Sequence, residues 1–197
     1  MIGSKGKMWA LLVLVALVQS AALFKMVYDR DRLLKNGREV MLSVRPLDPR
    51  DIFRGDYVTL GYDISSLKTS NLPEEKRASS DAIERGGTAY VTLTPNPAGG
   101  WTVAGVTPAY PAAVASGDIV LKANVLSIWR STDTTDAVLN LRYGIETYFV
   151  PEGTGRALED KVRSHKIEAI VAVDSSGEAA LRGLVVDGER HVDPPLL

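Results

Sequence analysis

The sequence predicts a mainly β protein: one antiparallel β-sandwich or partly open barrel with two short helices, preceded by an N-terminal transmembrane helix. Three observations support this fold class: an uncharged apolar run near the N-terminus, short segments with alternating apolar residues, and turn signals between those segments. Of the 197 residues, 45% are hydrophobic, which suffices for one domain with a core. We therefore divide the chain into an anchor at residues 1–36 and a β domain at residues 37–197.

The N-terminal segment has the composition of a membrane-spanning helix. Lys5 and Lys7 precede the uncharged residues 8–24, a run near the lower length limit for crossing a bilayer. Residues 26–28 extend the apolar run before Asp29 ends it. Because basic residues without acids precede the run, we expect the N-terminus in the cytoplasm. The sequence thus predicts a single-pass protein of the cytoplasmic (inner) membrane with its C-terminal domain outside the cytoplasm.

Two alternatives exist for this segment. The small residues Ser20, Ala21 and Ala22 fit the cleavage site of a secretory signal peptide, and a buried helix of a soluble protein is the third interpretation. We expect a retained anchor, because the apolar residues continue past the cleavable site. An anchor and a signal peptide both deliver the β domain outside the cytoplasm.

The first two strands follow from a period of two. Residues 38–46 and 57–64 alternate between apolar and polar side chains, and the segment between them carries the turn signals Asp48-Pro49 and Gly55. The apolar face of each strand should enter the core. Its predicted members are Val40, Leu42, Val44, Val58, Leu60, Tyr62 and Ile64.

The remaining chain predicts three more strand pairs and the two helices. Residues 88–95 and 101–108 form a hairpin signal, and residues 118–130 and 136–150 form a second pair. Residues 167–188 form a hairpin that turns at 175–177. The helices are expected within residues 71–87 and 155–164. Alternation places Trp101 and Trp129 on apolar faces, so we expect both in the core, with Tyr110 exposed.

Composition excludes several kinds of chemistry. The chain has no cysteine and two histidines, so thiolate catalysis and cysteine- or histidine-based metal clusters are not expected. Its net charge of -1 gives no electrostatic footprint for nucleic acid. No acidic calcium loop is present either. We expect no metal, no cofactor and no catalytic residues.

One stretch carries a family resemblance. Gly55, Asp56, Tyr57, Leu60 and Tyr62 supply all five fixed letters of Gly-Asp-Tyr-x-x-Leu-x-Tyr, and the chain is similar to the bacterial GDYxxLxY protein family. The similarity continues upstream through residues 46–50 and downstream in residues 142–159. The resemblance implies a small membrane-anchored protein that accompanies polytopic membrane proteins. It implies no reaction mechanism.

The same stretch has a structural and a functional interpretation. In the structural one, Gly55 makes a turn, Asp56 accepts backbone N–H groups, and Leu60 and Tyr62 enter the core. In the functional one, charged and aromatic residues of two segments form a rim that docks a partner or a small ligand of unidentified kind. Its candidate residues are Asp48, Arg50, Asp51, Arg54, Asp56 and Tyr57, with Arg142, Glu146, Tyr148, Glu152 and Arg156.

We expect a non-enzymatic accessory or binding module whose partner is an integral membrane protein. The rival is a hydrolase, because residues 43–60 also resemble the type I signal peptidase pattern, with Ser43 as nucleophile and Lys122 as the general base. Val44 after the serine, and the long spacing from Ser43 to Gly55, depart from that pattern.

Overall fold

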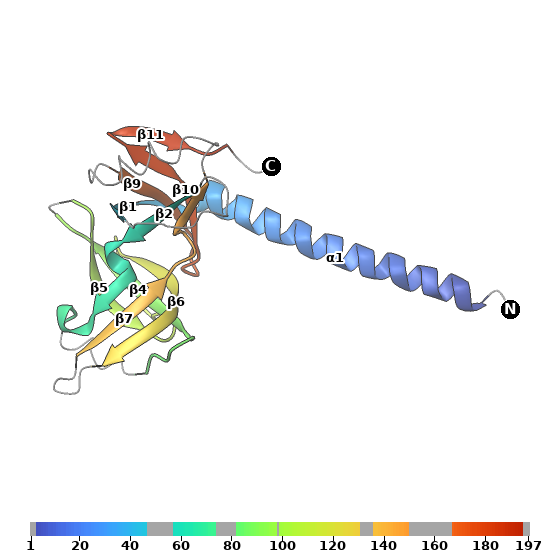
Figure 1. The fold of residues 1–197 in the computed structure, drawn as a ribbon, viewed down its shortest axis with the longest axis horizontal. Helices are drawn as coiled ribbons and strands as arrows, with labels where there is room; N and C mark the ends of the chain where they lie inside the picture. Colours follow the sequence, from blue (N-terminus) through green and yellow to red (C-terminus); the bar gives the residue numbers. More distant parts are fainter. Residues whose placement is uncertain are drawn as a thin grey trace.

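A computed structural model describes residues 3–46, 57–73, 82–97, 99–130, 136–149 and 167–194. One long helix projects from a β domain (Figure 1). Helix α1 spans Gly3–Asn36, and its large apolar side chains from Met8 to Tyr28 are exposed. In the described part of the chain, α1 is the helix long and apolar enough to cross a membrane. It is therefore an N-terminal apolar helix of the kind that serves as an anchor or a signal sequence.

Six strands form the first antiparallel sheet, in the order β11-β10-β9-β1-β2-β8. The bounds are β1 Arg38–Pro46, β2 Tyr57–Tyr62, β8 Thr147–Phe149, β9 Ile167–Val173, β10 Ala179–Val186 and β11 Glu189–Val192. Five strands form the second antiparallel sheet, in the order β3-β7-β6-β4-β5. The bounds are β3 Ser66–Lys68, β4 Thr88–Pro95, β5 Trp101–Thr107, β6 Ile119–Arg130 and β7 Ala137–Arg142.

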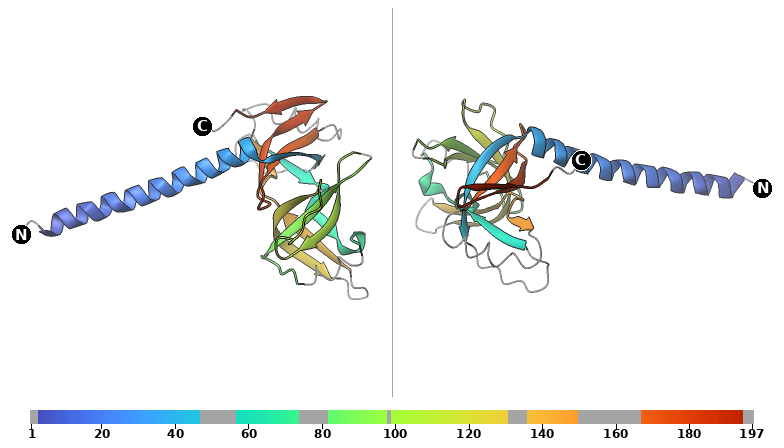
Figure 2. Two further views of the ribbon diagram at one scale, coloured as in Figure 1. Left: turned by 180° about the vertical axis from the view of Figure 1, so that it is seen from behind. Right: turned by 90° about the horizontal axis from the view of Figure 1, so that it is seen from above.

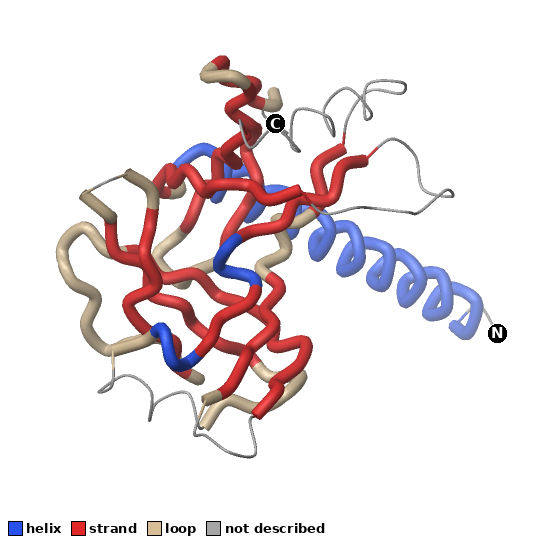
Figure 3. Tube along the Cα trace, turned by 60° about the vertical axis from the view of Figure 1, so that its left-hand side comes forward, coloured by secondary structure: helices blue, strands red, loops and turns tan. Residues whose placement is uncertain are grey.

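Both sheets curl into half-barrels around one core (Figure 3). Leu60 of β2, Leu93 of β4 and Leu121 of β6 have no exposed surface, and these residues join the two sheets in a single apolar cluster. The predicted faces of β1 and β2 are confirmed, since Val40, Leu42, Val44, Val58, Leu60, Tyr62 and Ile64 are all buried. The hairpins β4–β5 and β9–β10 are also confirmed. A period of two was sufficient to find β1, β2 and β4 because each buries one face.

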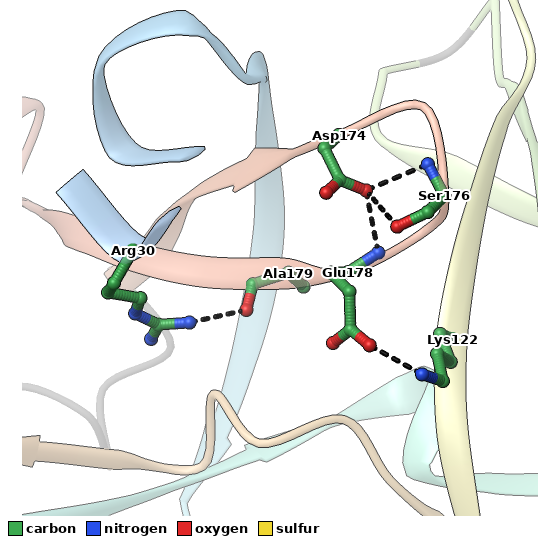
Figure 4. A network of polar contacts seen from close by, with 6 residues as sticks. All are labelled: Arg30, Lys122, Asp174, Ser176, Glu178 and Ala179. Carbon is green, nitrogen blue, oxygen red and sulfur yellow. Dashed lines mark hydrogen bonds and ion pairs between the residues drawn. The ribbon is translucent and has the colours of Figure 1, made fainter. Parts of the chain in front are cut away.

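The tip of the β9–β10 hairpin joins the two sheets at one point (Figure 4). Asp174 Oδ1 accepts hydrogen bonds from the backbone N–H groups of Ser176 (2.8 Å) and Glu178 (3.0 Å), which shapes the turn. The carbonyl of Gly177 then accepts the N–H of Lys122 on β6 (2.8 Å), and the Lys122 ammonium pairs with Glu178 (2.5 Å). The hairpin of one sheet is thus bonded to a central strand of the other.

The last turns of α1 dock on the first sheet. Arg30 donates from Nη1 to the carbonyl of Ala179 at the start of β10 (2.9 Å), and the carboxylate of Asp31, a nearly buried residue, pairs with Lys35 (2.8 Å). The N–H of Gly37 bonds to the carbonyl of Leu33 (2.8 Å), and β1 begins at the next residue. The helix therefore enters the domain without a linker.

The two short helices are not found in the described residues. Their predicted segments fall largely on residues 74–81 and 151–166, which lie outside the described ranges. At the described flanks, Thr69–Asn71 forms a 3-10 turn, and Gly87 N–H bonds to the carbonyl of Glu84 (3.1 Å) in another turn. Besides α1, the helical elements described are two 3-10 turns, at Asp63–Ser65 and Thr69–Asn71.

The strand predicted over residues 136–150 is two strands in different sheets. β7 ends at Arg142 in the second sheet, and β8 begins at Thr147 in the first. Gly144 lies between them with a φ of +79°, a conformation that interrupts an extended strand. Pairing of β6 with β7 is confirmed for the first part only.

The prediction that Trp129 is a core residue is wrong. The register of β6 against β7 shifts between Val125 and Ser127, as in a β-bulge. The extra residue reverses the alternation: Val125 is buried before the shift, but after it Ile128 packs on the core, and Trp129 is 70% exposed. Trp101 packs against the core as predicted, and Tyr110 is exposed. The register shift in β5 lies between Val103 and Gly105, so it does not separate Trp101 from Val103, with which its alternation was counted.

Replacement of Gly37 by alanine should destabilise the domain. A Cβ there would lie 2.6 Å from the Leu33 carbonyl oxygen and 3.0 Å from Ala172 Cβ, so α1 and β9 would have to separate. We expect Gly37→Ala to lower the free energy of unfolding by about 1–3 kcal/mol, measured by denaturant titration of the full chain in detergent. Gly6→Ala is the matched control, because its Cβ would meet nothing within 4 Å. Equal midpoints for the two variants would contradict this account of the junction.

Candidate functional site

The predicted rim lies partly outside the described residues. Asp48, Arg50, Asp51, Arg54, Asp56, Glu152 and Arg156 all fall in the ranges 47–56 and 150–166 that the structure does not describe. Of the other candidates, Tyr57 begins β2, Arg142 ends β7, Glu146 lies in the connection after β7, and Tyr148 lies in β8.

The structure brings the two candidate segments to one place. β2 and β8 are antiparallel neighbours, with Tyr57 opposite Phe149, Val58 opposite Tyr148, and Thr59 opposite Thr147. The chain therefore leaves the sheet at adjacent points: residues 47–56 connect to the start of β2, and residues 150–166 continue from the end of β8. This end of the first sheet, with Phe149 77% exposed, is called the motif end below.

Two tyrosines hold the connections that pass between the sheets. The hydroxyl of Tyr62, at the end of β2, donates to the carbonyl of Ile145 (2.7 Å). The hydroxyl of Tyr143, just after β7, donates to the carbonyl of Ile64 (2.7 Å). These four residues form what we call the tyrosine latch, and all four are buried. Each tyrosine satisfies a buried carbonyl on the other connection.

Glu146 shapes the connection from within. Its carboxylate accepts hydrogen bonds from the backbone N–H groups of Tyr143 (2.5 Å) and Gly144 (2.9 Å), and its carbonyl accepts the N–H of Leu60 (2.8 Å). The side chain thus caps the turn in which the chain passes from the second sheet to the first. Its described contacts give Glu146 a structural role, although it was predicted as a binding residue.

The latch hydroxyls are held in their neutral, donating form. Burial, with a smaller contribution from the nearby Glu146 charge, raises the pKa of Tyr62 and of Tyr143 far above the ordinary tyrosine value. A phenol in this state does not act as a base or a nucleophile near neutral pH. Leu60 and Tyr62 of the motif are both buried in the core, as the structural interpretation predicted.

Tyr148 and Arg142 do not meet. Tyr148 is half-buried, and its hydroxyl donates to Asp193 Oδ1 (3.0 Å). Burial and the Asp193 carboxylate raise the pKa of Tyr148 to about 12. Arg142 is exposed on the second sheet, opposite Asn124 of β6. The structure therefore separates the two candidates, leaving Tyr148 near the motif end.

Ser43 and Lys122 lie far from one another. Ser43 lies opposite Glu168 in the β1–β9 pair. Lys122 contacts the turn beside Ala179, and Ala179 lies level with Val173 of β9 and Arg38 of β1. Arg38 and Ser43 are five positions apart along β1, a distance of roughly 17 Å. The hydrogen bond and charge of Glu178 also raise the pKa of Lys122, so its amine is protonated. A serine hydrolase needs a neutral lysine beside the serine, and Lys122 does not provide one.

Alternation predicted the burial of Tyr62 but not the role of Tyr143, the second tyrosine of the latch. Tyr143 lies in the middle of the predicted strand 136–150, where its hydroxyl would have no special contact. The available signal was the Tyr143-Gly144 pair followed by Glu146, a turn glycine with a capping carboxylate two residues later. The contact with Ile64, 79 residues away, has no signal in a single sequence.

Comparison with known proteins gives one match. A family model described as GDYXXLXY protein matches residues 19–184, which includes the end of α1 and most of the β domain. Searches of curated proteins and of solved structures found no match.

Loss of either latch hydroxyl should destabilise the fold. Tyr62→Phe leaves the Ile145 carbonyl without its donor, and Tyr143→Phe does the same to Ile64, so each should cost about 1–3 kcal/mol of unfolding free energy. The double variant should lose less than the sum, because either change loosens the same pair of connections. Tyr110→Phe, at an exposed ring, is the control and should change stability by less than about 0.5 kcal/mol. Strict additivity in denaturant titrations would refute the coupling.

Alkaline pH should unfold the domain through its tyrosines. An unfolded tyrosine has a pKa of about 10, and the folded pKa of Tyr62, Tyr143 and Tyr148 is higher, so the folded chain holds protons that the unfolded chain releases. Their stabilisation is complete below about pH 10 and decreases as the pH rises above it. Unfolding free energies measured from about pH 8 to about pH 12 should fall more gently in Tyr62→Phe than in wild type. Parallel curves would contradict the assignment.

Proposed function

This chain belongs to the GDYXXLXY protein family, and we propose that it is a membrane-anchored extracytoplasmic module that docks, without catalysis, on an integral membrane protein. In this proposal α1 spans the cytoplasmic membrane once, with Lys5 and Lys7 inside and the β domain outside. The exposed apolar surface of α1 supports the anchor, because it suits lipid and the described part of the β domain does not bury it.

The observation that carries the proposal is the linker-free junction between α1 and the domain. Arg30 bonds to Ala179 of β10, Gly37 lies against Ala172 of β9, and Asp31 is buried at this junction. A domain on a flexible tether would sample all orientations, whereas this one presents a constant face beside the membrane. Confinement raises the effective concentration of a partner in the same membrane, and a fixed orientation lowers the entropy lost on binding. Docking can then rely on a small contact surface.

The motif end is the surface we assign to docking. The two segments that carry the charged candidates attach to the paired ends of β2 and β8, and the exposed ring of Phe149 lies there. An aromatic residue next in sequence to segments rich in arginine and carboxylates is a common composition for a protein contact. β1 leads from α1 toward this end, so the docking surface lies to one side of the anchor rather than directly on it.

Site-specific photocrosslinking tests this function. p-Benzoylphenylalanine in place of Phe149 should crosslink, in intact cells, to one integral membrane protein, and Arg54→Ala with Asp56→Ala should abolish that adduct. The matched control is the same probe at Trp129, which is similarly exposed but lies on the second sheet. Equal adducts from both positions, or an adduct that survives the double substitution in a folded protein, would refute docking at the motif end.

A serine probe separates this function from the hydrolase. We expect a fluorophosphonate to leave the full chain unlabelled in membranes. Labelling that disappears in Ser43→Ala would overturn the non-catalytic proposal.

A further inference from the structure

A cleft opens where α1 leaves the β domain. Its volume is about 1140 Å³. One wall is the outer part of the helix, including Met26 and Val27, and the other includes Tyr110 and Val114 from the segment between β5 and β6. Figure 2 shows α1 from two further sides, with only its C-terminal end at the β domain.

We infer that bilayer phospholipid fills the apolar part of this cleft, and that residues 108–116 form a second membrane contact beside α1. The inference rests on the proposed anchoring of α1 in the membrane. It adds which face of the domain touches the lipid, and it requires no partner protein.

The position of the helix in the bilayer sets the depth of the cleft. The residues from Met8 to Tyr28, among which Lys25 is the one charged residue, span about 30 Å at the rise of an α-helix, which matches the hydrocarbon thickness of a bilayer. Met26 and Val27 therefore lie at the outer edge of the hydrocarbon layer. The opposite wall of the cleft therefore lies at the same depth in the bilayer as Met26 and Val27, or slightly further out among the lipid headgroups.

The composition of the facing segment suits that depth. No charged residue occurs between Arg85 and Asp118. Within residues 108–116, Tyr110 is 40% and Val114 is 38% exposed, and the neighbouring prolines and alanines add apolar surface. The Tyr110 ring packs edge-on against Tyr90, with 5.6 Å between the ring centroids, so it is held in place. Tyrosine beside small apolar residues is typical of the layer where membrane proteins meet water.

The charged lining indicates what kind of lipid is accepted. The charged residues that line the cleft are four acids and three arginines: Asp29, Asp118, Asp174 and Glu178, with Arg30, Arg32 and Arg38. Arg30 is bonded to the Ala179 carbonyl, and Arg38 donates to the carbonyls of Gly117 (2.6 Å) and Asp118 (2.8 Å). The acids and bases nearly balance, and two of the arginines already have acceptors. The cleft therefore does not select an anionic headgroup, and zwitterionic phosphatidylcholine suffices.

Single-cysteine labelling tests the contact, because the chain has no cysteine of its own. We would label Val114→Cys with an environment-sensitive NBD probe in full-length protein reconstituted into phosphatidylcholine vesicles. The expected result is a blue-shifted emission, loss of quenching by aqueous iodide, and quenching by lipids spin-labelled near the headgroup. Replacing part of the phosphatidylcholine with phosphatidylglycerol should leave these values unchanged.

Two controls separate this inference from the anchor itself. Leu17→Cys reports whether α1 is inserted, and Leu126→Cys reports water at an exposed position roughly 20 Å along β6 from Val120. A Val114 probe that behaves like Leu126 while Leu17 is shielded would refute the lipid contact and leave the anchor standing. Iodide access at Leu17 would refute the anchor and, with it, this inference. A Val114 signal that appears only with phosphatidylglycerol would also overturn it, because an anionic headgroup would then be required.

Discussion

The tyrosine latch is the contact on which the rest of the fold depends. The chain passes between the sheets after β2 and again after β7, and the residues of the latch in both connections are buried. Each would leave a peptide carbonyl without a donor, at Ile64 and at Ile145, if the hydroxyls of Tyr143 and Tyr62 were absent. Because each tyrosine belongs to the connection that the other one bonds, the two connections hold each other in register.

That register decides where the motif end forms. Leu60 bonds to Glu146 through its backbone, and this contact continues into the pairing of Tyr57 with Phe149. The final tyrosine of the family motif therefore helps, from inside the core, to hold the strand pairing that begins at Tyr57. β1, bonded to both β2 and β9, connects the same end to α1 over roughly 30 Å of strand. The first sheet thus connects α1 and the latch to the motif end, which is why a fixed orientation at the membrane and a defined docking end are parts of the same proposal.

Local sequence patterns predicted the structure correctly where a segment could pack against the core in only one way. Val40, Leu42 and Val44 alternate with polar residues, and a strand that buries one face leaves no other arrangement. The same rule failed at Trp129, because the bulge between Val125 and Ser127 exists only through pairing with β7. It failed again at Tyr143, where the alternation of residues 136–150 continues through a change of sheet. Of the candidate site, the meeting of two distant segments was left open by the sequence, and the structural use of Glu146 was not foreseen.

The sequence by itself determined the apolar N-terminal helix, the β class of the domain and the family, because composition, periodicity and a short motif are local properties of the chain. Only the tertiary structure decided that Tyr62 meets Ile145, that Tyr57 lies beside Phe149, and that the uncharged segment around Tyr110 shares a cleft with α1. These contacts join residues more than 80 positions apart, and a pairing of that kind is chosen by the packing of the whole domain. No stretch of sequence carries it alone, because each partner would satisfy its own local pattern equally well beside another strand.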